Sequence, residues 1–209
     1  LTSEGYEVEA YAQKLIRNQP DAVSYSFKSV FQTQRGLYAQ ADLIRDNGDG
    51  TISLYEVKSS TSVKSRGQHN QIKDAAFQAI AAEEAGLQVA KVFIVHLNKD
   101  YVRQGDIDPE QLLIFADVTT DVAEIKADTR TEIDGALALL AQHEIYESSC
   151  SCLELTKSNH CDSFSYFNPS IPTPSIYTLP RISKTRIAGF VADGRFNLED
   201  IRLDEVTDK

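Results

Sequence analysis

A tight turn between two strand-like segments constrains the fold of this chain more than any other feature. Residues 46–50 read Asp-Asn-Gly-Asp-Gly, and the segments on both sides are short and rich in β-branched or aromatic residues. Such a pattern predicts a β-hairpin. Glu56 and Lys58 are two residues apart and share one face of the second strand. A turn centred near Asp49 sets Asp42 of the first strand opposite Glu56.

Two carboxylates and a lysine on one side of a hairpin suit a divalent-metal site that cuts phosphodiesters. Hard cations such as Mg²⁺ and Mn²⁺ take oxygen ligands and keep several waters. The bound ion acidifies a water and screens the phosphate, and a nearby lysine stabilises the charge that develops. The same pattern also fits a solvated turn in which Glu56 and Lys58 form an ordinary surface ion pair. Both interpretations are open from the local pattern.

Residues 45–56 also lie close to the twelve-residue calcium loop of an EF-hand. The positions that match are Asn47, Asp49, Gly50, Ile52 and Glu56. Position one, however, is Arg45, a cation where the loop needs a carboxylate. The flanking segments read as strands, whereas an EF-hand needs helices on both sides. A calcium-binding loop is therefore the third alternative.

Length and composition fit one domain with an appendage. The chain has 209 residues, of which 42% are hydrophobic, and no apolar run approaches the roughly 18 residues of a membrane span. No signal peptide opens the sequence, so we expect a cytoplasmic protein without membrane association. Because the sequence starts with Leu1 and contains no methionine, we expect it to be part of a longer chain.

The net charge of −10 argues against a general nucleic-acid binder, whose affinity comes from lysine and arginine. It does not exclude a nuclease, because a metal-dependent phosphodiesterase concentrates acid at its site. A basic group follows the hairpin and consists of Lys58, Lys64, Arg66 and Lys73. This group is either a solvated basic stretch or a track for phosphates.

Hydrophobic periodicity gives the order of the elements. We predict helices at 3–17, 68–85 and 121–143, and strands at 22–27, 30–33, 89–97 and in the two arms of the hairpin. The apolar segment 89–97 is typical of a buried, parallel strand. The order predicts an α/β (α+β) fold with a mixed central sheet flanked by helices.

This order resembles the PD-(D/E)XK nuclease superfamily, which has an αβββαβ, restriction-endonuclease-like core and the signature Asp, then Glu-x-Lys on the next strand. Four motifs more narrowly resemble an uncharacterised bacterial family related to RecB-type and CRISPR-associated exonuclease domains. They are Ala41-Asp42-Leu43, Glu56-Val57-Lys58-Ser59-Ser60-Thr61, Asp74-Ala75-Ala76-Phe77-Gln78 and residues 96–105. The resemblance covers most of residues 1–180.

The resemblance implies roles for the hairpin residues. Asp42 and Glu56 would be carboxylate ligands of a Mg²⁺ or Mn²⁺ ion, and the Val57 carbonyl would complete the protein's share. Lys58 would orient and help deprotonate the attacking water, or stabilise charge on the phosphate. These residues form the implied catalytic centre.

Two further residues come from the helices. Gln78 resembles the glutamine that opens the RecB-type helix motif and positions substrate or water, although the tyrosine expected four residues later is Ala82. The first helix carries Glu9 where RecB-type domains have a metal-binding histidine. Glu9 is therefore either a metal ligand or an exposed carboxylate favoured by the helix dipole.

All three cysteines lie in one short stretch, at Cys150, Cys152 and Cys161. An odd number in a reducing compartment argues against a disulfide framework and points to metal. RecB-like relatives hold a 4Fe–4S cluster with one upstream cysteine, which is absent from this sequence, and three later ones. Zinc held by the three thiolates and His160 is the rival. Thiols without a ligand are the third alternative.

The sequence thus divides into a nuclease-like core at 1–145, a cysteine-rich segment at 146–165, and a proline-rich connector with an acidic extension at 166–209. The extension either docks on the core or begins a further domain towards the C-terminus. The expected function is a metal-dependent DNA nuclease, acting on ends or single strands as the RecB resemblance implies. The alternative is a catalytically inactive nucleic-acid-binding or regulatory module of the same fold.

Overall fold

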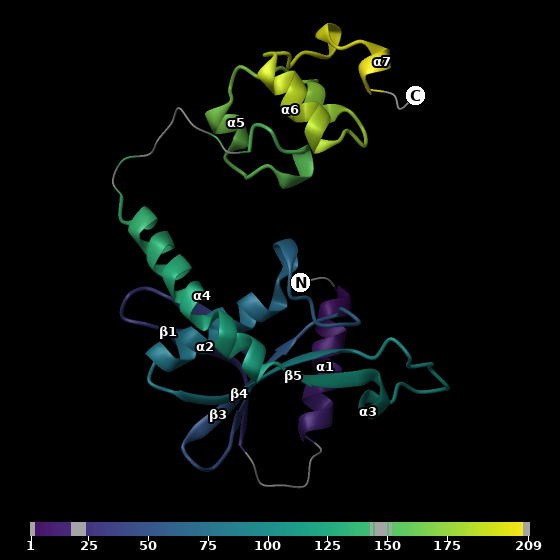
Figure 1. Ribbon diagram of the computed structural model, residues 1–209. Coiled ribbons are helices and arrows are strands. Elements are labelled where there is room, and N and C mark those ends of the chain that lie inside the picture. Colours follow the sequence, from purple (N-terminus) through teal and green to yellow (C-terminus); the bar gives the residue numbers. More distant parts are fainter. Residues whose placement is uncertain (1–2, 18–23, 143, 145–149, 151, 207–209) are drawn as a thin grey trace. The chain divides into compact units, whose positions relative to one another are not determined.

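Two compact units, divided after Ala141, make up the chain. The computed structural model describes residues 3–17, 24–142, 144, 150 and 152–206 (Figure 1). The N-terminal unit is built on a five-stranded mixed sheet, and the C-terminal unit consists of short helices joined by loops. Each unit has its own hydrophobic core.

The N-terminal unit runs helix, three strands, helix, strand, and then a short helix, a fifth strand and a long helix. Its elements are α1 (Ser3–Arg17), β1 (Tyr25–Gln32), β2 (Tyr38–Asp46), β3 (Thr51–Val57), the 3₁₀ helix η1 (Gly67–His69), α2 (Gln71–Glu84), β4 (Gln88–Leu97), α3 (Pro109–Leu112), β5 (Leu113–Asp117) and α4 (Thr119–Leu140). The strand order is β1-β2-β3-β4-β5, and every neighbouring pair is antiparallel except β3 and β4. The predicted α/β class with a mixed, helix-flanked sheet is confirmed.

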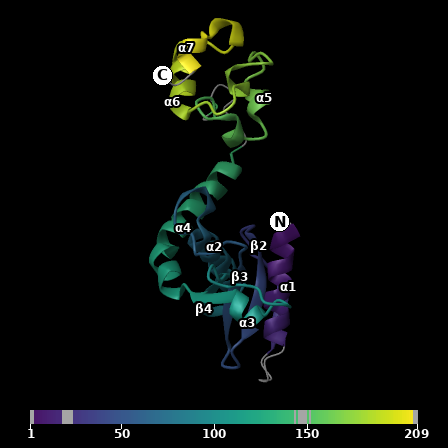
Figure 2. The same cartoon turned by 90° about the vertical axis from the view of Figure 1, so that its right-hand side faces the viewer.

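Helices cover both faces of the sheet (Figure 2). On one face α1 buries the helical stripe Val8, Ala12 and Ile16 against strand residues. On the other face α2 packs through a stripe of small residues, which lets the helix approach the strands closely. That stripe consists of Ala75, Ala76, Ala79 and Ala82. The start of α4 covers the same face through Val118 and Val122.

Strand β4 is covered on both faces of the sheet over its second half. Its Ile94 and Val95 point to opposite faces and both are fully buried. β4 pairs in parallel with β3, and α2 makes the crossover between them. The expected parallel strand at 89–97 is confirmed by the pairing with β3. Burial is concentrated in residues 92–96, whereas Ala90 and Lys91 are exposed.

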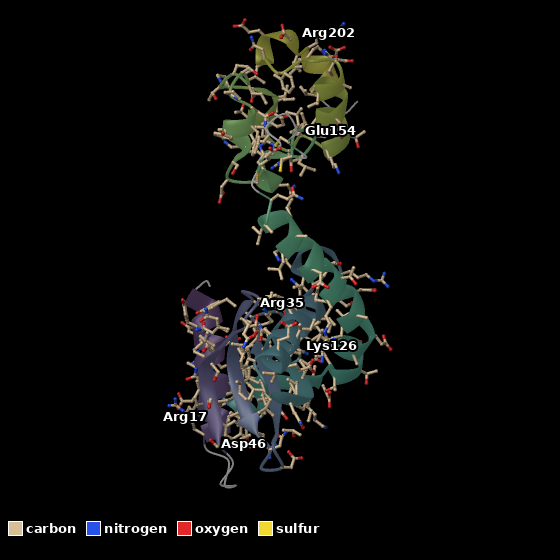
Figure 3. The ribbon with its side chains drawn as sticks, turned by 90° about the vertical axis from the view of Figure 1, so that its left-hand side faces the viewer. Arg17, Arg35, Asp46, Lys126, Glu154 and Arg202 are labelled. Atoms are coloured by element: carbon tan, nitrogen blue, oxygen red, sulfur yellow. The ribbon has the colours of Figure 1, made fainter. Side chains whose placement is uncertain are left out.

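Ion pairs link the two helices on the α2 face. Glu83 of α2 accepts hydrogen bonds from Lys126 and Arg130 of α4, and Arg35 of the β1–β2 turn pairs with Glu84 (Figure 3). Arg35 contacts Glu84 through two nitrogens, at 2.8 and 2.6 Å. Because these groups are partly exposed, each pair adds little stability by itself. The two Glu83 pairs join α4 to α2, and the Arg35 pair joins the β1–β2 turn to α2.

Some boundaries differ from the prediction. The strands expected at 22–27 and 30–33 are one strand, β1, and residues 22 and 23 lie outside the described residues. The helix expected at 68–85 is split at Asn70, whose side chain caps α2 by accepting from the Lys73 N–H. The third helix ends at Leu140, and His143 lies outside the described residues.

The C-terminal unit packs the cysteine segment together with the segment that follows it. Its elements are η2 (Lys157–Asn159), α5 (Phe164–Phe167), η3 (Ile176–Thr178), α6 (Lys184–Ala192), η4 (Leu198–Asp200) and α7 (Leu203–Val206). Ile176, Tyr177, Ile187 and Phe190 form its core. The Tyr177 hydroxyl donates to the Leu153 carbonyl. The segment at 166–209, expected as a connector and an extension, therefore carries the core of this unit.

No helix in the described part of the chain is both long enough and apolar enough to cross a bilayer.

Candidate active site

The predicted hairpin is present, and its strands separate at the candidate site. The β2–β3 ladder ends at the Leu43–Tyr55 pair, so the next position places Asp42 across from Glu56. Beyond that pair, a side chain replaces the backbone as hydrogen-bond acceptor: Asp42 Oδ2 accepts from the Val57 N–H at 2.8 Å. Asp42 is thereby fixed against the end of β3. The proposed ligand role of the Val57 carbonyl stays a prediction.

Strands, not helices, flank the Asp-Asn-Gly-Asp-Gly turn. Gly48 and Gly50 adopt φ values of +78° and +85°, which glycine allows without strain. Asp49 accepts hydrogen bonds from both the N–H and the hydroxyl of Thr51, and the hydroxyl bond is the main cause that lowers its pKa. The turn carboxylate therefore stabilises the hairpin itself. The helix-loop-helix geometry of an EF-hand is not adopted here.

Glu56 is a buried carboxylate held by two donors. Its Oε1 accepts from Lys58 Nζ at 2.6 Å, and its Oε2 accepts from Gln78 Nε2 of α2 at 2.7 Å. Burial, and next the repulsion of the Asp42 carboxylate, raise the pKa of Glu56 to about 7, against the opposing effect of Lys58 and Gln78. Asp42 and Glu56 are therefore electrostatically coupled.

Lys58 bridges two carboxylates. Its Nζ lies 2.6 Å from Glu56 Oε1 and 2.6 Å from Asp74 Oδ2 at the start of α2. Burial disfavours the charge, but the Glu56 and Asp74 carboxylates outweigh burial and raise the pKa of Lys58. The contact between Asp74 and Lys58 was not predicted from the sequence. The spacing of Asp74 from Gln78 was the available signal, because residues four apart share one face of a helix.

Glu9 also reaches this site. It is only 6% exposed, which rules out the alternative of an exposed helix carboxylate. Its Oε1 accepts from Gln13 Nε2 at 2.9 Å, and its Oε2 lies 2.7 Å from Lys28 Nζ. The same Nζ lies 2.7 Å from Asp42 Oδ1. Burial opposes the charge on Lys28, but the hydrogen bonds to Asp42 and Glu9 raise its pKa.

Lys28 enters the site through an irregular backbone, and the sequence interpretation did not identify it. Its φ of +52° is uncommon for a residue other than glycine. Phe27 packs in the α1 cluster and Phe31 in the α2 cluster, although residues four apart share one face of a regular strand. The side-chain alternation of β1 therefore reverses at Lys28. Nothing in the local composition signals this reversal.

A cavity of about 530 Å³ opens beside Lys58. Ser59, Ser60, Lys64 and His69 contribute to its wall. Of the basic residues expected as a phosphate track, Lys58 and Lys64 thus border one cavity, while Lys73 forms an ion pair with Glu132. The cavity joins the candidate catalytic lysine to further polar and basic side chains.

The donor chemistry of Glu9, Asp42 and Glu56 fits a hard divalent cation, since all three offer carboxylate oxygens. As they lie now, however, no set of three acidic, histidine or cysteine side chains among the described residues converges on one ion. The Lys28 ammonium lies between Glu9 and Asp42, and each of these carboxylates is in contact with it. The three carboxylates thus offer suitable ligand oxygens, and two of them now pair with Lys28.

The three cysteines are neighbours in the C-terminal unit. The Cys161 thiol hydrogen bonds with Cys152, and this bond, supported by the charge of Cys152 and Cys150, raises the pKa of Cys161. Within the described part of the chain, the thiols do not form a group that converges on one ion. The His160 ring stacks on Phe164 at 3.6 Å, and its Nε2 lies 3.0 Å from the Leu155 carbonyl. A zinc site that includes His160 would have to use Nδ1.

No protein-family model and no curated protein matches the chain. Among solved structures, the chain is similar to the crystal structure of SSO0001, with 11% sequence identity and a TM-score of 0.34. The match covers 68% of this chain and 62% of the SSO0001 chain, so this chain spans less than two thirds of the length of SSO0001. At this TM-score the similarity carries no argument about fold or function.

Proposed function

We propose that the N-terminal unit is a metal-dependent nuclease that hydrolyses phosphodiester bonds in DNA with Mg²⁺ or Mn²⁺. The observation that carries the proposal is a pair of hydrogen bonds where β2 and β3 separate: Asp42 accepts from the N–H of Val57, the residue after Glu56, and Glu56 accepts from Lys58. The resemblance to PD-(D/E)XK nucleases assigns Asp42, Glu56 and Lys58. Glu9 would be a further ligand, on the same oxygen chemistry.

Each side chain has a distinct task in this proposal. Asp42 and Glu56 would hold the metal ion, which when bound supplies an acidified water and screens the scissile phosphate. Lys58 remains charged and is held beside Glu56, so it can stabilise negative charge on the phosphate. Gln78 holds Glu56 by donating to Oε2, which makes it a positioning residue. The cavity beside Lys58 would receive the DNA backbone.

We propose single-stranded DNA or DNA ends as substrates, and this part of the proposal rests only on the resemblance to RecB-type domains. The proposal also includes a cytoplasmic location, because Cys150, Cys152 and Cys161 are free thiols and disulfides are rare in that compartment. In the C-terminal unit these three thiolates would contribute three ligands to a 4Fe–4S cluster. Zinc is the alternative occupant.

A second candidate is a catalytically inactive nucleic-acid-binding or regulatory module. Two observations favour it. Lys28 occupies the space between two of the candidate ligands, and Ala82 replaces the tyrosine of the RecB-type motif. In such a module the acidic cluster would be stabilised by lysines instead of a metal ion.

Cleavage of a fluorescent single-stranded oligonucleotide with Mn²⁺ separates the two candidates. We expect wild-type protein to cleave, and Glu56→Gln and Lys58→Ala to lose about 100-fold or more of the rate, a typical loss when one charge-stabilising group is removed. Lys91→Ala is the matched control, because Lys91 pairs with Asp117 on the sheet away from the site. If wild-type protein binds Mn²⁺ and leaves the oligonucleotide intact, the inactive module is the correct assignment.

A further inference from the structure

Lys28 contacts two of the three carboxylates that offer ligand oxygens for a divalent cation. Its Nζ is 2.7 Å from Glu9 Oε2 and 2.7 Å from Asp42 Oδ1. We propose that Lys28 is an internal cation that fills the Glu9–Asp42 half of the site and competes with the divalent metal ion for both carboxylates. This inference rests on the proposed function, since it concerns the metal site of the nuclease.

The hydrogen bonds of the two carboxylates explain why an ion and Lys28 exclude each other. Glu9 Oε1 is engaged by Gln13 Nε2 at 2.9 Å, and Asp42 Oδ2 is engaged by the Val57 N–H at 2.8 Å. The second oxygen of each carboxylate, Glu9 Oε2 and Asp42 Oδ1, contacts Lys28. Glu9 and Asp42 would hold a metal ion through these same two oxygens, because the other two are engaged. It can bind there only if the ammonium moves away.

Burial shows which partner is able to move. The side chains of Glu9 and Asp42 are 8% and 15% exposed, whereas that of Lys28 is 33% exposed. A lysine stem can therefore carry its ammonium to water while both carboxylates stay in place. Lys58 differs, because it pairs with Glu56 and Asp74 and takes no part in the Glu9–Asp42 contact.

The backbone supports an assigned role for Lys28. The left-handed φ of +52° lies in the middle of β1, at the point where the side-chain alternation reverses. Lysine has no special preference for this conformation, whereas glycine and asparagine tolerate it. Continuing the β1–β2 register places Lys28 opposite Asp42. The strand thus departs from regular geometry at the residue that delivers a positive charge to the site.

Two states of the site follow. Without metal, Lys28 compensates two carboxylates that are mostly buried, so the unit folds without an ion. With metal, the ion replaces the ammonium, and the cost of moving Lys28 weakens the observed metal affinity. Removing the lysine charge therefore strengthens metal binding and weakens the metal-free fold.

The test uses Lys28→Met, which removes the charge and keeps a long side chain. Mn²⁺ binding is measured without DNA by calorimetry and by the electron paramagnetic resonance of free Mn²⁺. We expect Lys28→Met to bind Mn²⁺ at least about tenfold more tightly than wild type, a change of about 1.4 kcal/mol. In chelator its melting temperature falls below that of wild type, and Mn²⁺ raises it by a larger amount. Lys91→Met, the exposed control on β4, leaves Mn²⁺ affinity unchanged.

Lys28→Arg keeps the positive charge and covers the case in which Lys28→Met does not fold. It is expected to bind Mn²⁺ no more tightly than wild type. Equal or weaker Mn²⁺ affinity in Lys28→Met, tighter affinity in Lys28→Arg, or no Mn²⁺ binding in any variant each overturns the inference. Tighter binding by Lys28→Met without DNA cleavage overturns the nuclease and leaves the competition standing. If wild-type protein cleaves DNA but Lys28→Met binds Mn²⁺ with wild-type affinity, the nuclease assignment stands and the competition by Lys28 is overturned.

Discussion

The raised pKa of Glu56 makes the stability of the N-terminal unit depend on pH. Its ordinary value is 4.5, and burial with Asp42 nearby raises it to about 7 in the folded protein. Folding therefore favours the protonated carboxyl. The contribution of Glu56 to stability is fully present below about pH 4.5 and is lost as the pH rises through about 7.

The magnitude follows from the size of the shift. A change from 4.5 to about 7 corresponds to roughly 3 kcal/mol, at about 1.4 kcal/mol for each unit. Glu56 is 9% exposed, so solvent screening reduces this value little. In Glu56→Gln the titrating group is gone. The stability of this variant relative to wild type should therefore increase by roughly 3 kcal/mol between about pH 4 and about pH 8.

Urea unfolding in the presence of chelator measures this difference, because the N-terminal unit is then free of metal. The relevant quantity is the change with pH in the gap between the two unfolding free energies. The absolute gap also includes the contacts that Lys58 and Gln78 lose. Glu124→Gln, on the exposed side of α4, is the control and should run parallel to wild type. A gap between Glu56→Gln and wild type that stays constant over this range would refute the electrostatic reasoning.

Two further predictions concern the core and the thiols. Ile94→Ala removes a fully buried side chain from β4 and should lower the unfolding free energy by about 3 kcal/mol, measured by circular dichroism in denaturant. A loss below about 1 kcal/mol would contradict the complete burial of Ile94 in a well-packed core. Anaerobically purified full-length protein should absorb near roughly 400 nm if Cys150, Cys152 and Cys161 hold an iron–sulfur cluster. Cys161→Ser should remove that band, and colourless protein with one equivalent of zinc would favour zinc instead.

The long, periodic elements could be predicted from the sequence. The bounds of α1 agree with the prediction, because its apolar stripe keeps helical spacing from Val8 to Ile16. The hairpin was predictable from its turn residues, and β4 from its continuous apolar run. In each case a local pattern and the tertiary packing favour the same structure.

Elements whose existence depends on tertiary contacts could not be predicted in this way. β5 has only five residues, and its apolar run at 113–116 is too short for periodicity to separate a strand from a buried helical turn; pairing with β4 decides the structure. α6 had usable signals, since Ser183 caps its first turn and Gly194 follows its end with φ of +67°. The prolines before α6 and the acidic residues after it led instead to the prediction of a connector and an extension at 166–209.

The candidate site was predicted in part for a related reason. Asp42, Glu56 and Lys58 come from one hairpin, so strand periodicity is enough to bring them together. Lys28 depends on a backbone reversal within β1, and Asp74 depends on how α2 docks on the sheet. Both are long-range consequences of the fold. Short-range spacing in the sequence contains little information about them.

The charges of the assembled site connect its stability to its proposed chemistry. Four carboxylates and two lysines meet there, with Glu9 and Asp42 around Lys28, and Glu56 and Asp74 around Lys58. Above about pH 7, where Glu56 is also ionised, two negative charges remain in excess, which is the charge that one divalent cation would neutralise. Buried carboxylates without any cation are costly, so the lysines allow this cluster to form before a metal ion arrives. Because the lysines neutralise part of the negative charge, they also weaken the attraction of the carboxylates for a metal ion. A nuclease built this way would fold readily without metal and would become active only when enough metal is present to displace Lys28.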